Sequence, residues 1–115
     1  LDTLHRECSD MRVLIVCHGE VMWGFRYLLE RMSQERFREL HLSKDPRDRI
    51  WNCQILHYTR RHPVTGKLEK HADWMRMIRP TETPVWIRNW EPIVRTRYSN
   101  DDLLRSVRRI PVLIK

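Results

Sequence analysis

Long apolar runs are absent from this chain of 115 residues. No stretch approaches the about 20 consecutive apolar residues that a membrane-spanning helix needs. The first residues also lack the basic region, apolar stretch and small-residue cleavage site of a secretory signal peptide. We therefore expect a cytoplasmic protein with no membrane partner. The chain does not begin with methionine, which favours a piece of a longer protein.

Cysteine is scarce, and the three residues Cys8, Cys17 and Cys53 are widely spaced with no Cys-x-x-Cys pair. This pattern indicates neither a disulfide framework nor a zinc site. We expect reduced cysteines, at least two of them buried, and neither a metal nor another cofactor.

Positive charge is in excess, because the chain has 22 Lys and Arg residues and only 15 Asp and Glu residues, which gives a net charge of +7. Such an excess attracts anions of any kind. However, the basic residues alternate with acidic ones through residues 26–49, and no basic run with interleaved aromatics forms a nucleic-acid module. Nucleic acid is therefore not the partner we expect, and the oligomeric state stays open.

An apolar run, Met11 to Cys17, leads directly into His18 and Gly19. Its β-branched, nearly continuous apolar character predicts a strand covered on both faces. From Glu20 onward, apolar residues recur at spacings of three and four, which predicts an amphipathic helix. Those residues are Val21, Met22, Phe25, Leu28, Leu29 and Met32. A histidine at the carboxyl end of a strand and beside a helix N-terminus is where α/β proteins bind phosphate.

Further elements are predicted downstream of this helix. Ser33 is suited to cap a second helix that ends at Asp45-Pro46. Strands over 52–58 and 67–78, joined by a turn with Pro63 and Gly66, predict a β-hairpin. If that turn centres near Val64, two histidines lie opposite each other, which we interpret as a polar pair and not a metal site. These histidines are His57 and His71.

The character of the chain changes after Arg79-Pro80. Prolines and two tryptophans predict an irregular extension that wraps or docks. These residues are Pro80, Pro84, Trp86, Trp90 and Pro92. Ser99 with Asp101 and Asp102 then predicts the start of a short helix with a basic last turn.

Three of these motifs together resemble the carboxyl-terminal half of a histidine phosphatase (phosphoglycerate mutase-like) domain over roughly residues 11–79. The motifs are strand-His18-Gly19, Phe25-x-x-Leu28-Leu29 and Asn52-x-x-Ile55-x-x-Tyr58. The resemblance implies an α/β fold, a three-layer α/β/α sandwich with a mixed, mostly parallel sheet of which this chain supplies the second half. It divides the chain into residues 1–79, the phosphatase-like half domain, and residues 80–115, a Pro/Trp-containing extension with a short helix.

The resemblance also implies a role for the His18-Gly19 pair. The family joins two histidines, two arginines and an acidic residue around a transferred phosphoryl group, and its nucleophile is the histidine of an Arg-His-Gly motif. His18 matches the second histidine. The run from His18 to Trp23 also resembles the Arg-His-Gly motif of the nucleophile, which often continues His-Gly-Glu-x-x-Trp. However, Cys17 stands where that motif requires arginine. We therefore prefer the interpretation that His18 corresponds to the second histidine of the family, and not to the nucleophile.

Each residue of this motif has an expected role. His18 is the catalytic candidate, as a phosphate ligand that stabilises the charge of the transferred group. Gly19 allows the backbone to approach phosphate closely. Glu20 is first a helix-start residue and second a substrate-selecting one. Arg26 lies more than one turn into the helix, and we expect it on the surface.

The resulting hypothesis is a phosphohydrolase that removes phosphate from a small phosphomonoester through a phosphohistidine. The nucleophile lies outside this chain, so activity needs the amino-terminal part of the same domain, and a phosphomutase is the less favoured activity. The alternative is a catalytically inactive phosphatase-like module that binds an anionic partner.

Overall fold

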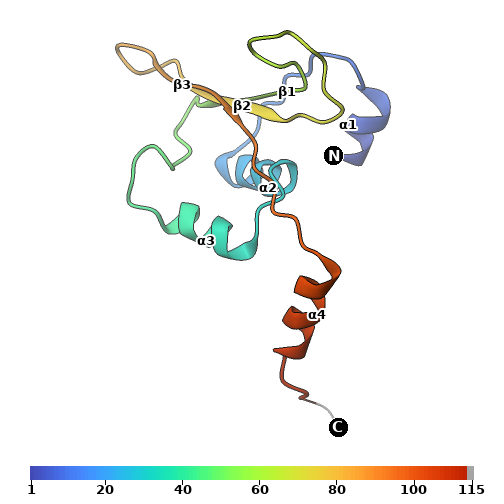
Figure 1. Cartoon of the computed structure of the whole chain (residues 1–115). Helices are drawn as coiled ribbons and strands as arrows, with labels where there is room; N and C mark the ends of the chain where they lie inside the picture. The colour runs from blue at the N-terminus through green and yellow to red at the C-terminus, as the bar shows by residue number, and fades with distance from the viewer. Residues whose placement is uncertain (114–115) are drawn as a thin grey trace.

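The computed structural model describes residues 1–113, which form four helices and one small antiparallel sheet (Figure 1). The sheet has the strand order β1-β2-β3, and helices α2 and α3 lie on one side of it, whereas α4 stands apart from the body (Figure 1). The elements are α1 (Asp2–Glu7), α2 (Gly19–Leu29), α3 (Gln34–Leu42), β1 (Ile55–Thr59), β2 (Trp74–Arg79), β3 (Trp86–Pro92) and α4 (Asn100–Arg108). No helix among the described residues is long and apolar enough to cross a membrane.

The expected three-layer α/β/α sandwich with a mostly parallel sheet is wrong. Both strand pairs are antiparallel, and each joins segments that follow one another in the chain. A parallel pair would need a crossover connection that returns a second strand beside the first. Residues 11–17 do have an extended course, but they pair with no strand within residues 1–113.

The prediction that residues 11–17 are covered on both faces is also wrong. The side chains of Leu14 and Val16 are 87% and 91% exposed. Val13 and Ile15, which point the other way along an extended chain, are 48% and 44% exposed. An apolar extended segment therefore lies uncovered immediately before α2.

The predicted hairpin is confirmed, because β1 and β2 pair antiparallel with Leu56 opposite Met77. Its second strand begins at Trp74 instead of Lys67, because the chain first makes an isolated bridge between Arg61 and Leu68 around the turn. Gly66 has a φ of 71° in that turn, a conformation that favours glycine. The shorter strand places Arg76, and not His71, opposite His57.

The segment with Trp86 and Trp90, predicted to be irregular, forms strand β3 and pairs with β2. Its prolines do not prevent this pairing. Pro84 precedes the strand, and Pro92 is its last residue on the outer edge of the sheet, where a missing backbone N–H is tolerated.

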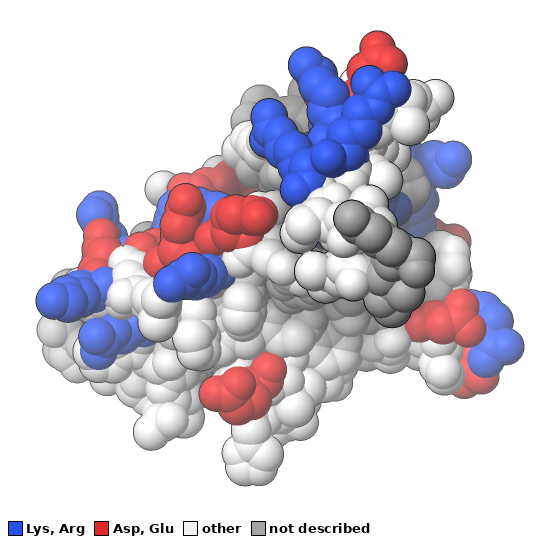
Figure 2. Space-filling model, turned by 90° about the horizontal axis from the view of Figure 1, so that it is seen from below, with Lys and Arg blue, Asp and Glu red and all other residues white. Residues whose placement is uncertain are grey.

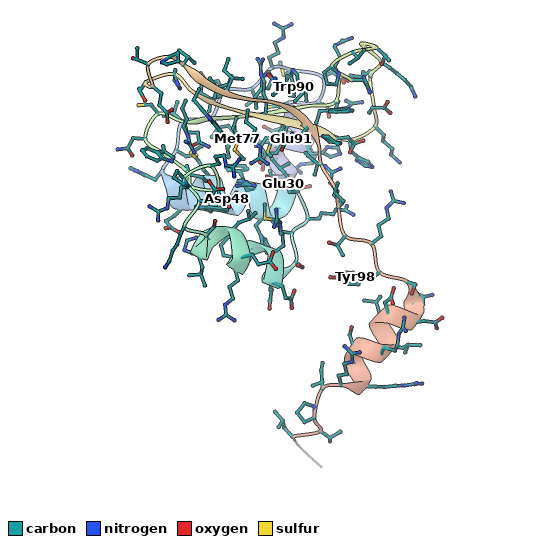
Figure 3. All side chains as sticks on the ribbon, turned by 60° about the vertical axis from the view of Figure 1, so that its left-hand side comes forward. Glu30, Asp48, Met77, Trp90, Glu91 and Tyr98 are labelled. Carbon is teal, nitrogen blue, oxygen red and sulfur yellow. The ribbon has the colours of Figure 1, made fainter. Side chains whose placement is uncertain are left out.

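The core lies between the sheet and the helices. Met75 and Met77 alternate along β2 with half-buried residues, and the side chain of Met77 is 1% exposed. Trp23 of α2 and Leu40 of α3 are the buried apolar residues of the helices. Figure 3 shows Met77 on the helix side of the sheet and Trp90 on the opposite side.

Arg79, at the end of β2, is a charged member of this core and 4% exposed. Its guanidinium group lies 4.9 Å from the ring centroid of Trp51 and 4.2 Å from that of Trp86. It donates hydrogen bonds to Gln54 Oε1 at 3.1 Å and to the carbonyl of Pro46 at 2.6 Å. Arg79 therefore fixes the loop between α3 and β1 against the sheet.

Glu30 joins α2 to the sheet. Its carboxylate accepts hydrogen bonds from Arg26 Nε and from the Tyr58 hydroxyl of β1, both at 2.8 Å (Figure 3). Arg26 is 4% exposed, so its predicted place on the surface is wrong. Burial, with the nearby Glu30 carboxylate, raises the pKa of Tyr58 well above its usual range, so the phenol stays a donor.

Replacement of Glu30 is expected to destabilise the fold strongly. Glu30→Ala leaves the buried Arg26 guanidinium and the Tyr58 hydroxyl without their acceptor, which costs about 3 kcal/mol. Urea denaturation measures this loss. The matched control is Glu39→Ala on α3, whose carboxylate pairs with Arg36 in solvent and contributes less than about 1 kcal/mol. Equal losses for the two variants would contradict this account of α2.

Candidate functional site

The candidate site is the N-terminus of α2, where His18 occupies the N-cap position. Its backbone is extended, with φ −79° and ψ 160°, and its imidazole makes no capping hydrogen bond. The first helical hydrogen bond runs from Met22 N to the carbonyl of His18 at 3.0 Å. The N–H groups of Gly19, Glu20 and Val21 therefore precede the helical ladder and give this end of the helix its positive character.

Solvent reaches all three residues of the predicted motif, since His18, Gly19 and Glu20 are exposed. A Cβ atom added at Gly19 would meet no atom within 4 Å, and the φ of Gly19 lies outside the left-handed region. Neither crowding nor strain within the described chain therefore requires glycine at this position. Open space over a glycine at a helix N-terminus leaves room for an anion to approach the backbone closely.

Glu20 has the predicted helix-start placement. It is the acidic residue of the first turn of α2, where it complements the helix dipole. It also borders a shallow hollow between α2 and α3. The hollow is lined by Glu20, Trp23, Gly24, Tyr27, Gln34 and Phe37.

The walls of this hollow are aromatic. Phe37 meets Trp23 at a centroid distance of 5.7 Å and Tyr27 at 5.6 Å, both edge to face at 87°. Gly24 leaves the centre open, because a Cβ atom there would also meet nothing within 4 Å. This hollow was not predicted, although Trp23, Gly24 and Tyr27 lie at spacings that place them on one helix face with Glu20.

Local contacts keep the two helices of the site in place. Ser33 caps α3 as predicted, since its hydroxyl accepts a hydrogen bond from Arg36 N at 3.1 Å. The Arg26–Glu30 pair, at a spacing of four, joins α2 to β1 through Tyr58. That spacing was the sequence signal for a structural role of Arg26, but it does not distinguish a buried pair from an exposed one.

Two further predictions about candidate ligands are corrected by the structure. Cys8 and Cys17 are half-buried and Cys53 is exposed, so the expectation of two buried cysteines is wrong. His57 does not face His71. The described residues contain no group of three or more side chains that could hold a metal ion.

His57 instead belongs to a cluster on the side of the sheet away from the helices. Its Nδ1 accepts a hydrogen bond from Arg76 Nε at 3.1 Å, and both side chains contact the ring of Trp90. Burial, followed by the charge of Arg76, lowers the pKa of His57. A lowered pKa in the folded state means that His57 contributes stability above its unfolded pKa of about 6.5 and that this contribution is lost as the pH falls.

An NMR titration of the His57 ring protons is expected to give a pKa below the ordinary histidine value of about 6.5. Arg76→Gln removes the neighbouring charge and is expected to move this pKa upward, whereas the control Arg36→Gln on α3 leaves it unchanged. A His57 pKa at or above 6.5 in the unaltered chain would contradict the proposed surroundings of this ring.

Family models, curated proteins and solved structures were each compared with the chain, and none of them matches it.

Proposed function

We propose that this chain carries the phosphate-binding half of a phosphohydrolase of the histidine phosphatase type, which acts on a small phosphomonoester. The observation that carries the proposal is the junction of His18 and Gly19, where an exposed imidazole adjoins the N-terminus of an 11-residue helix. The proposal depends on this local geometry and on the motif, and not on the sandwich architecture that the structure contradicts.

In the proposed reaction, the phosphorus–oxygen bond of the ester breaks and a phosphorus–nitrogen bond forms to a histidine outside this chain. The leaving alkoxide takes up a proton from solvent. Water then attacks the phosphohistidine, the phosphorus–nitrogen bond breaks, and inorganic phosphate is released while a proton returns to solvent. The transferred group carries negative charge on its equatorial oxygens, so catalysis depends on positioning and on charge stabilisation. His18 donates a hydrogen bond to one of these oxygens, and the N–H groups of Gly19 and Glu20 face others.

The uncovered segment before the site supports completion by a second strand. Residues 13–16 are apolar, extended and 44% or more exposed. An extended segment of this kind has backbone N–H and C=O groups available for strand pairing. We assign the partner of this segment to the amino-terminal part of the same domain, which supplies the nucleophilic histidine.

The hollow beside Glu20 receives the part of the substrate that leaves with the ester oxygen. Its aromatic walls suit an apolar group, and the Glu20 carboxylate accepts hydrogen bonds from a hydroxyl or ammonium group. Glu20 is thus the residue that we associate with substrate selection.

The test is His18→Ala in the longer protein that includes the nucleophilic segment. Loss of one preorganised donor is expected to lower kcat for p-nitrophenyl phosphate by about a hundredfold or more. His5→Ala is the matched control, because His5 is an exposed histidine on α1, and it is expected to leave kcat unchanged. Residues 1–115 alone are expected to show no turnover.

Near-normal turnover of the His18→Ala protein would remove His18 from the site. If the longer protein shows no turnover but is retained on nucleic acid in a salt-sensitive manner, the inactive binding module becomes the better hypothesis.

A further inference from the structure

Helix α4 stands away from the rest of the molecule and has no buried residue (Figure 1). Its apolar side chains are all half exposed or more. The exposed fractions are 50% for Leu103, 53% for Leu104 and 64% for Val107, and Ile110, which follows the helix, is 65% exposed. No described element covers these side chains.

The apolar and basic residues of α4 occupy different faces. At 100° per residue, Leu103, Leu104 and Val107 fall within an arc of about 100° of the helix circumference. The arginines occupy the flank and the opposite side, and they are Arg105, Arg108 and Arg109. Figure 2 views the molecule from below, the side on which α4 lies in Figure 1, and shows several Lys and Arg side chains gathered on this face.

Among the described residues, Arg95 makes the last side-chain hydrogen bonds between the body and the chain that leads to α4. The guanidinium group of Arg95 donates to the carbonyls of Leu29 at 3.1 Å and Ala72 at 2.7 Å and pairs with Asp73. The connection then continues through Tyr98, which is 56% exposed (Figure 3).

The start of α4 is set by its own residues. Ser99 and Asp102 form a reciprocal capping box, in which Ser99 Oγ accepts from Asp102 N and the Asp102 carboxylate accepts from Ser99 N. Such a cap stabilises a helix N-terminus without contacts to the body. The segment therefore combines a locally capped amphipathic helix with a short connection from an anchored arginine.

We propose that α4, with the chain following it to Leu113, binds the surface of an anionic membrane. The apolar face enters the boundary between headgroups and acyl chains, and the arginines contact anionic headgroups. Val112 and Leu113, which are 76% and 87% exposed, extend the apolar face beyond the helix. The sequence-based expectation of no membrane partner considered only membrane-spanning runs.

Size argues against a second copy of the chain as the occupant of this face. A helix of nine residues is about 14 Å long and about 10 Å across, so one face offers on the order of a few hundred Å². A stable dimer buries about 800 Å² on each partner. A lipid surface has no such minimum area, and an anionic one is opposite in charge to the basic flank of the helix.

The proposal is tested by cosedimentation of the chain with vesicles of phosphatidylcholine alone or mixed with phosphatidylserine. Binding is expected only to the mixed vesicles. One arginine near an anionic surface is worth about fivefold in affinity, so Arg108→Gln/Arg109→Gln is expected to weaken binding by roughly 25-fold. Leu104→Glu/Val107→Glu is expected to abolish it. These residues make no buried contact, so the variants are expected to keep the thermal unfolding midpoint of the parent chain.

The matched control is Arg36→Gln/Arg38→Gln, which removes the same charge from the exposed side of α3 and is expected to keep most of the binding. Three outcomes would overturn the proposal. They are failure to bind the mixed vesicles, equal loss in the control, and a dimer that Leu104→Glu/Val107→Glu converts to monomer without any vesicle binding. The proposal is independent of the proposed phosphatase activity.

Discussion

The carboxylate of Glu30 is the contact on which the placement of the candidate site depends. It accepts hydrogen bonds from Arg26 of α2 and from Tyr58 of β1, so one largely buried group fixes both the rotation of α2 and its distance from the sheet. The N-terminus of α2, with His18 and Gly19, lies at the far end of the same helix. A buried ion pair with a third donor restricts the arrangement more than apolar packing alone, because displacement of any member leaves an unpaired polar group.

A second constraint is the small amount of apolar surface that this chain buries. One side of a three-stranded sheet packs on α2 and α3, whereas residues 13–16 and the apolar face of α4 are exposed. Exposed apolar segments of this kind mark interaction surfaces. The two exposed segments of this chain differ in their chemistry. The segment before His18 offers backbone groups for pairing with a strand, and α4 offers an apolar face flanked by arginines.

Features set by local interactions could be predicted from the sequence. The caps at Ser33 and Ser99, the helix after Gly19 and the β1–β2 hairpin depend on neighbouring residues, and the structure confirms them. Features set by contacts with residues distant in the sequence could not be predicted from it. The apolar run before His18 was expected to lie inside a sheet, but its hydrophobicity does not determine whether a partner strand is present.

The same limit explains the errors at β3 and at Arg26. Proline and tryptophan content suggested an irregular segment around Trp86, yet the pairing partner on β2 determined its structure. The burial of Arg26 and Arg79 depends on an acidic side chain, on aromatic rings and on carbonyl groups supplied by other elements. For His18, Gly19 and Glu20, the sequence predicted the helix start, whereas the aromatic hollow beside Glu20 depends on the packing of α3 against α2.

The most direct test of the central claim is an NMR titration of the chain with inorganic phosphate, observed through backbone amide and histidine ring resonances. If the N-terminus of α2 binds phosphate, the amide signals of Gly19, Glu20 and Val21 and the ring signals of His18 shift together with one dissociation constant. His18→Ala should weaken that binding. Shifts confined to the arginines of α4, or no shift at the three amides at saturating phosphate, would contradict the account.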